Sequence, residues 1–235
     1  MSGDGTRTDG NRRIPPLRIV VADDERMVRT ALRAILSAEP DLTVVGEAAD
    51  GAEAVSVVRE AAPDVVLMDV RMPGIDGIRA TELILAGTTA ADTSPPRILV
   101  VTTFENDAYV YDALRAGAAG FLLKRAAAED LVAAVRLVAR SDSLLFPSAV
   151  RTLAASYAGP AAGSPPPWAA RLTEREADVL RLMATGLTNA EIAGRMAIGR
   201  ATVKTHVASV LAKTGTRDRT QAVIAAYETG FVSPR

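Results

Sequence analysis

Short apolar runs alternate with amphipathic segments of helical length over residues 17–140. The apolar runs are LRIVVA, LTVVGE, DVVLMD, RILVVT and AGFLL, and the helices expected after them span about 25–37, 51–61, 76–86, 106–116 and 127–139. Runs this short, rich in β-branched residues and each followed by a helix, predict a parallel sheet with helices on both faces. The expected fold class is therefore an α/β domain with a five-stranded, doubly wound sheet.

The pattern changes after residue 170, where only short helices are expected. Thr173 and Thr188 are each followed three residues later by glutamate, which is the signature of a capped helix start, and glycines follow or separate the segments. The expected helices start at these two threonines and then span about 200–213 and 218–229. Helices this close together, two of them joined by a tight turn, predict a small all-α helix-turn-helix domain over 171–235.

Two segments are expected to lie outside the domains. The sequence SYAGPAAGSPPPWAA, ending at residue 170, is rich in proline and glycine and predicts an extended tether, so the linker is placed at 141–170 with a partly helical start left open. Trp168 is expected to anchor the end of the tether by packing on the second domain. Residues 1–16 are polar and glycine-rich and are predicted to be a disordered tail.

Composition narrows the function classes. There is no cysteine and a single histidine, so disulfides and thiolate metal sites are excluded and zinc is disfavoured. No apolar run approaches the length of a membrane span and the first residues lack the apolar core of a signal peptide, so the chain is expected to be soluble and cytoplasmic. Residues 17–140 carry 13 Lys+Arg against 19 Asp+Glu, whereas 171–235 carry 10 against 6. This split suggests that the second block binds a polyanion, with solvated surface charge as the alternative.

Asp69 is the candidate centre of a functional site. It follows the apolar run Val65–Met68 and precedes a Pro-Gly turn, so it lies at the carboxyl end of a buried strand, where open α/β sheets bind ligands. Asp23 and Asp24 follow the first strand, which neighbours the third if the strand order is 2-1-3-4-5. Three carboxylates in one pocket require a cation, and an open all-oxygen site suits Mg²⁺ (or Mn²⁺). Asp23 and Asp24 alone could instead be ordinary acids at a helix start.

Two further polar residues are expected at the same edge. Thr102 ends the fourth strand and Lys124 follows the fifth. A nucleophilic carboxylate, a metal, an ammonium and a hydroxyl are the groups needed to form an aspartyl phosphate, with Lys124 and Thr102 binding the phosphoryl oxygens. Either residue alone would be an ordinary polar residue at a strand end.

On these residues, 17–140 resembles the receiver domain of two-component response regulators. The resemblance implies that a sensor histidine kinase phosphorylates Asp69. It also implies that Asp24, Asp69 and the backbone carbonyl of Arg71 hold Mg²⁺, with Asp23 acting mainly through metal-bound water. Phe121 matches the aromatic switch position that acts with Thr102. Many receivers have proline after the lysine, but this chain has Arg125 there, so no cis peptide is assumed.

The segment from Leu172 to Val232 is similar to the LuxR-type helix-turn-helix domain, and the two modules together resemble the NarL/FixJ subfamily. The resemblance implies that the helix at about 188–195 supports a second helix, at about 200–213, which enters the DNA major groove. The candidate DNA-binding residues are Arg200, Lys204, Thr205, His206 and Lys213. Of the basic residues near the end of this helix, Lys213, Arg217 and Arg219 are expected to meet phosphate or water. His206 could equally be a packed or solvated side chain. The apolar face formed by Ala222, Val223, Ala226 and Tyr227 could supply a dimer contact or pack within the molecule.

The sequence thus predicts a DNA-binding transcription regulator that is switched by phosphorylation of Asp69. It is not expected to be an enzyme. Its expected partners are a sensor histidine kinase, double-stranded promoter DNA and, when phosphorylated, a second copy of the chain, because one small domain with few cations should bind DNA weakly. One alternative is a LuxR-type regulator that works without phosphorylation. The other is a phosphohydrolase resembling the haloacid dehalogenase family, although that family places its nucleophile after the first strand.

Overall fold

The structure is a computed structural model that describes residues 15–87, 95–103, 107–140, 150, 152, 156 and 166–233. The first domain contains β1 (Leu17–Ala22), α1 (Arg26–Ser37), β2 (Leu42–Ala48), α2 (Gly51–Ala61), β3 (Val65–Met68), α3 (Gly77–Gly87), β4 (Arg97–Thr102), α4 (Asp107–Ala116), β5 (Gly120–Leu123) and α5 (Ala128–Arg140). The second contains the 3₁₀ helix η1 (Ala169–Arg171), α7 (Glu174–Ala184), α8 (Asn189–Met196), α9 (Arg200–Thr214) and α10 (Arg219–Glu228).

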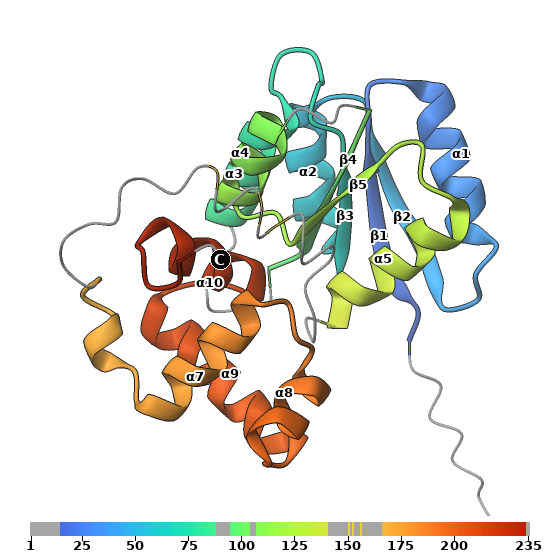
Figure 1. The fold of residues 1–235 in the computed structure, drawn as a ribbon. Coiled ribbons are helices and arrows are strands. Elements are labelled where there is room, and N and C mark those ends of the chain that lie inside the picture. The colour runs from blue at the N-terminus through green and yellow to red at the C-terminus, as the bar shows by residue number, and fades with distance from the viewer. Residues whose placement is uncertain are drawn as a thin grey trace, which may run out of the picture.

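The five strands form one parallel sheet in the order β2-β1-β3-β4-β5, which confirms the predicted fold class and strand order. Helices cover both faces of the sheet (Figure 1). All four residues of β3 are buried, as expected for a central strand covered on both sides. Since β1 and β3 pair directly, the loops that follow them lie side by side at the carboxyl edge of the sheet.

Alternate strand residues supply two separate apolar cores. Val20, Val66 and Val100 face the side covered by α2, α3 and α4, while Ile19 and Leu67 face the side covered by α1 and α5. This division follows from the two-residue period of a strand, which sends successive side chains to opposite faces. The strands are therefore packed on both faces by apolar side chains.

The second domain is a compact group of helices whose starts match the sequence prediction. Thr173 and Glu176 form a complete capping box at α7, and Thr188 and Glu191 form another at α8. Trp168 packs against the Phe231 ring, with 5.1 Å between ring centroids, which confirms its expected anchoring role.

Helix α10 packs on its own domain with one face. Ala222, Val223, Ala226 and Tyr227 are buried, and the Tyr227 hydroxyl donates to the Ala184 carbonyl in α7 at 3.2 Å. Of the two alternatives for this apolar face, packing within the molecule is therefore the one that the structure shows.

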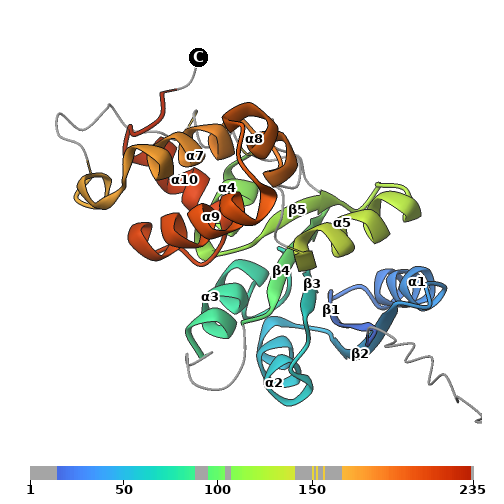
Figure 2. The same cartoon turned by 90° about the horizontal axis from the view of Figure 1, so that it is seen from below.

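The opposite face of α10 packs against the first domain, beside α4 in both views (Figures 1 and 2). The Tyr111 hydroxyl donates to the Glu228 carboxylate at 2.5 Å, and the Gln221 amide donates to the Leu114 carbonyl. Ile224 lies between Gln221 and Glu228 on the same helix face and is buried in an apolar cluster that includes α4 side chains. We call this contact the docking interface.

The docking interface also reaches the amino ends of two strands. Arg97, the first residue of β4, lies 3.3 Å from the Asp218 carboxylate at the start of α10, and the Thr220 hydroxyl donates to the Ala119 carbonyl just before β5 at 2.7 Å. The second domain therefore docks at the edge of the sheet opposite the carboxyl ends of the strands.

Several sequence predictions fall wholly or largely outside the described residues. Residues 1–14 of the predicted tail belong to this group, as do most of the linker residues between 141 and 165. Within the described part of the chain there is no cis peptide, and no helix has the length and apolarity needed to span a membrane.

Candidate functional site

The three predicted acids converge at the carboxyl edge of the sheet. Asp23 and Asp24 follow β1, Asp69 follows β3, and each offers a carboxylate oxygen within 4.8 Å of the others. Asp23 and Asp69 are buried and Asp24 is exposed. The Asp69 backbone N–H donates to the Ala22 carbonyl at 2.8 Å, which extends the pairing of the two strands as far as the site.

Lys124 brings a positive charge to this cluster from the end of β5. Its ammonium lies 2.6 Å from the Asp23 carboxylate and 3.4 Å from that of Asp69. Only 10% of the lysine side chain is exposed, so these ion pairs are shielded from solvent. Glu25, on the exposed side, lies 3.6 Å from the same ammonium.

The pKa values of Asp69 and Lys124 are shifted by burial and by the charges of neighbouring groups. The pKa of the Asp69 carboxyl is raised to about 6, mainly by burial; the Lys124 ammonium opposes this rise and the Asp23 carboxylate adds to it. Burial alone would lower the pKa of Lys124, but its hydrogen bond to Asp23 and the charges of Asp69 and Asp23 leave that pKa above the ordinary value. The Asp69 carboxylate is therefore less stable as an anion than an exposed one, which favours a partner that adds positive charge.

The remaining predicted site residues lie around this cluster. Thr102 ends β4 and is 2% exposed. Its backbone carbonyl accepts a hydrogen bond from the backbone N–H of Lys124 at 2.8 Å. Phe121 lies in β5, half-buried, beside the core that contains α4 side chains. Arg71 lines a cavity of about 430 Å³ that extends from the cluster. The cavity lining comprises Asp24, Val70, Arg71, Met72, Asp76, Ile78 and Tyr109.

The residues present suit a hard divalent cation. The cluster offers oxygen donors from two adjacent loops, with one exposed carboxylate and two buried ones. Mg²⁺ and Mn²⁺ prefer oxygen ligands in open sites that leave positions for a phosphoryl group. A thiolate site was excluded by the composition, so the donor chemistry and the geometry agree.

Helix α9 presents its predicted DNA-binding residues to solvent. Arg200, Lys204 and Thr205 are exposed along its first two turns, and His206 is half-buried. The helix has no acidic residue in its first turn and its last turn contains Lys213. Arg200, Lys204 and Thr205 are exposed in the arrangement in which α10 contacts the first domain.

Two basic residues have partners that the sequence did not reveal. Lys213 lies 2.6 Å from the Glu176 carboxylate, which also accepts from the Ser209 hydroxyl, and these bonds lower the pKa of Glu176 to about 2. Arg219 was expected near phosphate or water, and that expectation is wrong. It is 3% exposed and donates to the Asn189 side chain and the Leu187 carbonyl, which ties α10 to the start of α8.

The fold and the site together define a class of protein. A doubly wound domain holds an acid cluster with a paired lysine at the carboxyl ends of its strands, and a helix-turn-helix domain follows it. This is the architecture of a receiver domain joined to a DNA-binding output domain.

Comparisons with known proteins agree with this class. Residues 19–136 match the response regulator receiver domain, and residues 170–226 match the LuxR family of bacterial regulatory proteins. The chain is 38% identical over 217 residues to the transcriptional regulatory protein LiaR of Bacillus subtilis, which covers 92% of this chain and all of that protein. It is 37% identical over 223 residues to the response regulator protein VraR of Staphylococcus aureus, which covers 92% of this chain and 99% of that protein.

A solved structure supports the same assignment. The LuxR-family two-component response regulator from Aurantimonas sp. SI85-9A1 has 34% sequence identity and a TM-score of 0.53, over 59% of this chain and 96% of that one. The chain belongs to the response regulators of two-component systems, with a receiver domain and a LuxR-type DNA-binding domain. It is therefore a transcriptional regulator, as the sequence predicted.

Proposed function

We propose that a sensor histidine kinase phosphorylates this protein at Asp69 and that phosphorylation changes how it binds promoter DNA. The observation that carries the proposal is the buried Asp69 carboxylate, 3.4 Å from the Lys124 ammonium and grouped with Asp23 and Asp24. A carboxylate in this setting can act as a nucleophile toward a phosphoryl group, and the nearby ammonium can neutralise the negative charge of that group. The proposed setting is the cytoplasm, where kinase output and promoter DNA meet.

The proposed chemistry is a single phosphoryl transfer. A carboxylate oxygen of Asp69 forms a bond to phosphorus, the bond between phosphorus and the kinase imidazole nitrogen breaks, and that nitrogen keeps the electron pair. The Lys124 ammonium and the Thr102 hydroxyl bind phosphoryl oxygens. Asp23, Asp24, Asp69 and the backbone carbonyl of Arg71 would hold Mg²⁺ or Mn²⁺, which supplies charge neutralisation during transfer.

The docking interface offers a route from this site to the DNA-binding domain. In the proposed switch, Thr102 moves toward the phosphoryl group and Phe121 follows into the space it leaves. Phe121 packs beside the core that α4 shares, and α4 carries Tyr111 and Leu114, which contact α10. A change in α4 would weaken the docking interface and free α10 for a second copy of the chain, so the active form is proposed to be a homodimer on DNA.

We expect Glu228→Gln to loosen the docking interface. The Glu228 carboxylate accepts from the Tyr111 hydroxyl at 2.5 Å and lies 3.2 Å from the Arg115 guanidinium, so the change weakens both contacts between domains. Hydrogen bonds to charged groups contribute about 1.5–3 kcal/mol, and partial exposure of Glu228 places the loss near the lower bound. Small-angle scattering of the unphosphorylated protein should show a larger radius of gyration.

The matched control for this variant is Glu82→Gln. It removes the same charge from an exposed glutamate that pairs within α3, with Arg79 at 2.7 Å. The radius of gyration should then stay at the wild-type value. Equal compaction of the Glu228 variant and wild type would contradict the role given to the docking interface.

Binding to DNA is proposed to use the exposed side of α9, through Arg200, Lys204, Thr205 and His206, with Lys213 retained as a weaker candidate because Glu176 holds it. We expect Lys204→Ala to weaken promoter binding about tenfold, by loss of a base or phosphate contact. Titrations at several salt concentrations separate the two roles, because loss of a phosphate contact lowers the slope of log affinity against log salt by about one.

A control for DNA binding is Arg79→Ala, which removes an exposed cation from the receiver domain. Its affinity and salt slope should equal those of the wild type. If Lys204→Ala matched the control in both respects, the proposed orientation of α9 would be wrong.

The proposed function as a whole is tested by DNA footprinting before and after treatment with Mg²⁺ and a small phosphodonor. Tighter binding and a footprint covering two half-sites after treatment are expected. An unchanged footprint from protein that has gained a phosphoryl group would favour regulation that does not depend on phosphorylation.

A further inference from the structure

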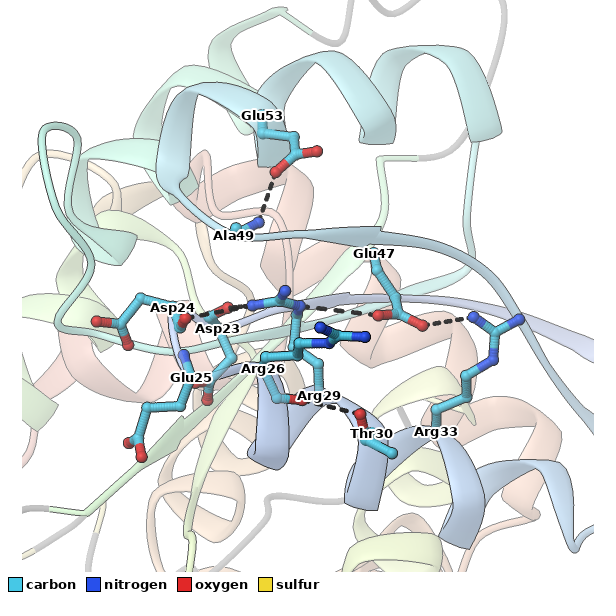
Figure 3. A network of polar contacts seen from close by, with 10 residues as sticks. All are labelled: Asp23, Asp24, Glu25, Arg26, Arg29, Thr30, Arg33, Glu47, Ala49 and Glu53. Atoms are coloured by element: carbon cyan, nitrogen blue, oxygen red, sulfur yellow. Dashed lines mark hydrogen bonds and ion pairs between the residues drawn. The ribbon is translucent and has the colours of Figure 1, made fainter.

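The Arg29 side chain extends from α1 toward the backbone of Asp23 and Asp24 (Figure 3). Its guanidinium donates to the Asp23 carbonyl at 2.6 Å and, more weakly, to the Asp24 carbonyl at 3.3 Å. Only 15% of the arginine side chain is exposed, whereas that of Arg33, one turn further along α1, is 58% exposed. Arg29 is therefore half-buried, and its guanidinium contacts the backbone of two acids of the site.

This placement runs against the ordinary electrostatics of a helix. The start of a helix carries partial positive charge and favours acids, yet the first turn of α1 has no acidic residue and the N-cap Glu25 makes no side-chain capping bond. The Asp23 carboxylate instead accepts the Glu25 N–H at 2.9 Å. A cation held here needs specific compensation, and the two carbonyls provide part of it.

Glu47 provides the rest of the compensation. Its carboxylate, at the end of β2, lies 3.7 Å from the Arg29 guanidinium and 2.5 Å from that of Arg33 (Figure 3). Arg29 thus links the loop after β1 to the neighbouring strand. Arg33 shares the Glu47 contact, and among the described residues Glu47 is its hydrogen-bond partner, so the two arginines differ in whether they touch the acid loop.

The backbone contact matters because Asp23 and Asp24 are consecutive. Consecutive residues of a strand direct their side chains to opposite faces, yet both of these carboxylates lie in one cluster with Asp69. The chain must bend at this dipeptide, and both of its carbonyls accept from the same guanidinium. The planar guanidinium has several N–H donors in fixed directions, so it can donate to both carbonyls at once. A lysine ammonium on its flexible side chain would hold the two carbonyls in a less fixed geometry.

We propose that Arg29 is a positioning residue that holds the bend at Asp23 and Asp24 and thereby sets the metal-binding geometry of the site. The inference rests on the proposed phosphoacceptor function. Residues that do not bind the metal but orient its ligands by hydrogen bonds typically contribute 10- to 100-fold to metal affinity. We accordingly expect Arg29→Gln to lower Mg²⁺ affinity about tenfold.

A purely electrostatic effect of Arg29 predicts the opposite change in Mg²⁺ affinity, so the direction of the change distinguishes the two roles. Removal of a cation close to three carboxylates should raise Mg²⁺ affinity if Arg29 acted only through its charge. Arg33→Gln is the matched control, since it removes the same charge from the same helix and leaves the Asp23 and Asp24 carbonyls untouched. Arg29→Lys keeps the charge and changes only the donor geometry.

The experiment is Mg²⁺ titration of the full-length protein by calorimetry for wild type and the three variants, at a temperature where circular dichroism shows each one folded. A fall in affinity for both Arg29 variants, with Arg33→Gln equal to or tighter than wild type, supports the inference. Wild-type affinity or tighter binding in both Arg29 variants overturns it. Absence of Mg²⁺ binding by the wild type would instead remove the proposed function on which the inference rests.

Discussion

Asp69→Asn is expected to abolish phosphoryl incorporation, whereas the wild type gains the mass of one phosphoryl group when treated with Mg²⁺ and a small phosphodonor. The amide removes the nucleophilic oxygen anion and replaces a buried charge that pairs with Lys124 at 3.4 Å. Intact-mass spectrometry after removal of the donor measures the result directly.

Asp64→Asn serves as the control for this experiment. Asp64 immediately precedes β3, at the amino end of the strand that Asp69 follows, and its carboxylate accepts the Arg18 backbone N–H at 2.8 Å. The control should gain the same mass as the wild type. A gain in Asp69→Asn equal to that of the control would place the phosphoacceptor on another residue.

Gly77→Ala is expected to destabilise the receiver domain, although alanine normally favours a helix over glycine. A methyl group at this position would lie 1.8 Å from the Asp69 carbonyl oxygen, and the Gly77 N–H donates to the Val70 carbonyl at 2.9 Å. Overpacking costs about 1–3 kcal/mol, and a clash with backbone rather than a flexible side chain places this change at the upper end. Thermal unfolding monitored by circular dichroism gives the loss.

The same helix offers a control at its other end. A methyl group on Gly87, the last residue of α3, would meet no atom of the described residues within 4 Å, so Gly87→Ala should be neutral or slightly stabilising. Since the clash at Gly77 displaces the Asp69 backbone, the folded fraction of Gly77→Ala should also incorporate phosphoryl groups more slowly. Unfolding curves that coincide for the two variants would show that the Gly77 site can relax.

The fold and the acid cluster could be predicted because their signals are local. The four apolar residues of β3 mark a strand buried on both faces, and the acids directly after β1 and β3 must meet once these strands are neighbours. The capping boxes at Thr173 and Thr188 were equally readable, because each depends on residues three positions apart. Local periodicity and local hydrogen bonding carried these predictions.

Contacts between distant segments were not predictable in the same way. The arginine at 219 resembles a surface cation in the sequence, but the fold buries it between α10 and the start of α8. The Lys213 ammonium donates a hydrogen bond to the Glu176 carboxylate, which is 37 residues away in the sequence. The roles of Arg29 and Glu228 likewise depend on which segments pack together. Neither residue belongs to a sequence motif that would identify its role.

The positions of the docking interface and the acid cluster have a consequence for the order of events. Thr102 and Lys124 lie at the carboxyl ends of β4 and β5, whereas Arg97 and Ala119, which contact α10, lie at the amino ends of the same two strands. In the proposed function, a kinase domain would therefore approach Asp69 at the sheet edge opposite the docked output domain. Under the proposed function, the closed form would itself be the kinase substrate, and opening would follow as a later, separate step.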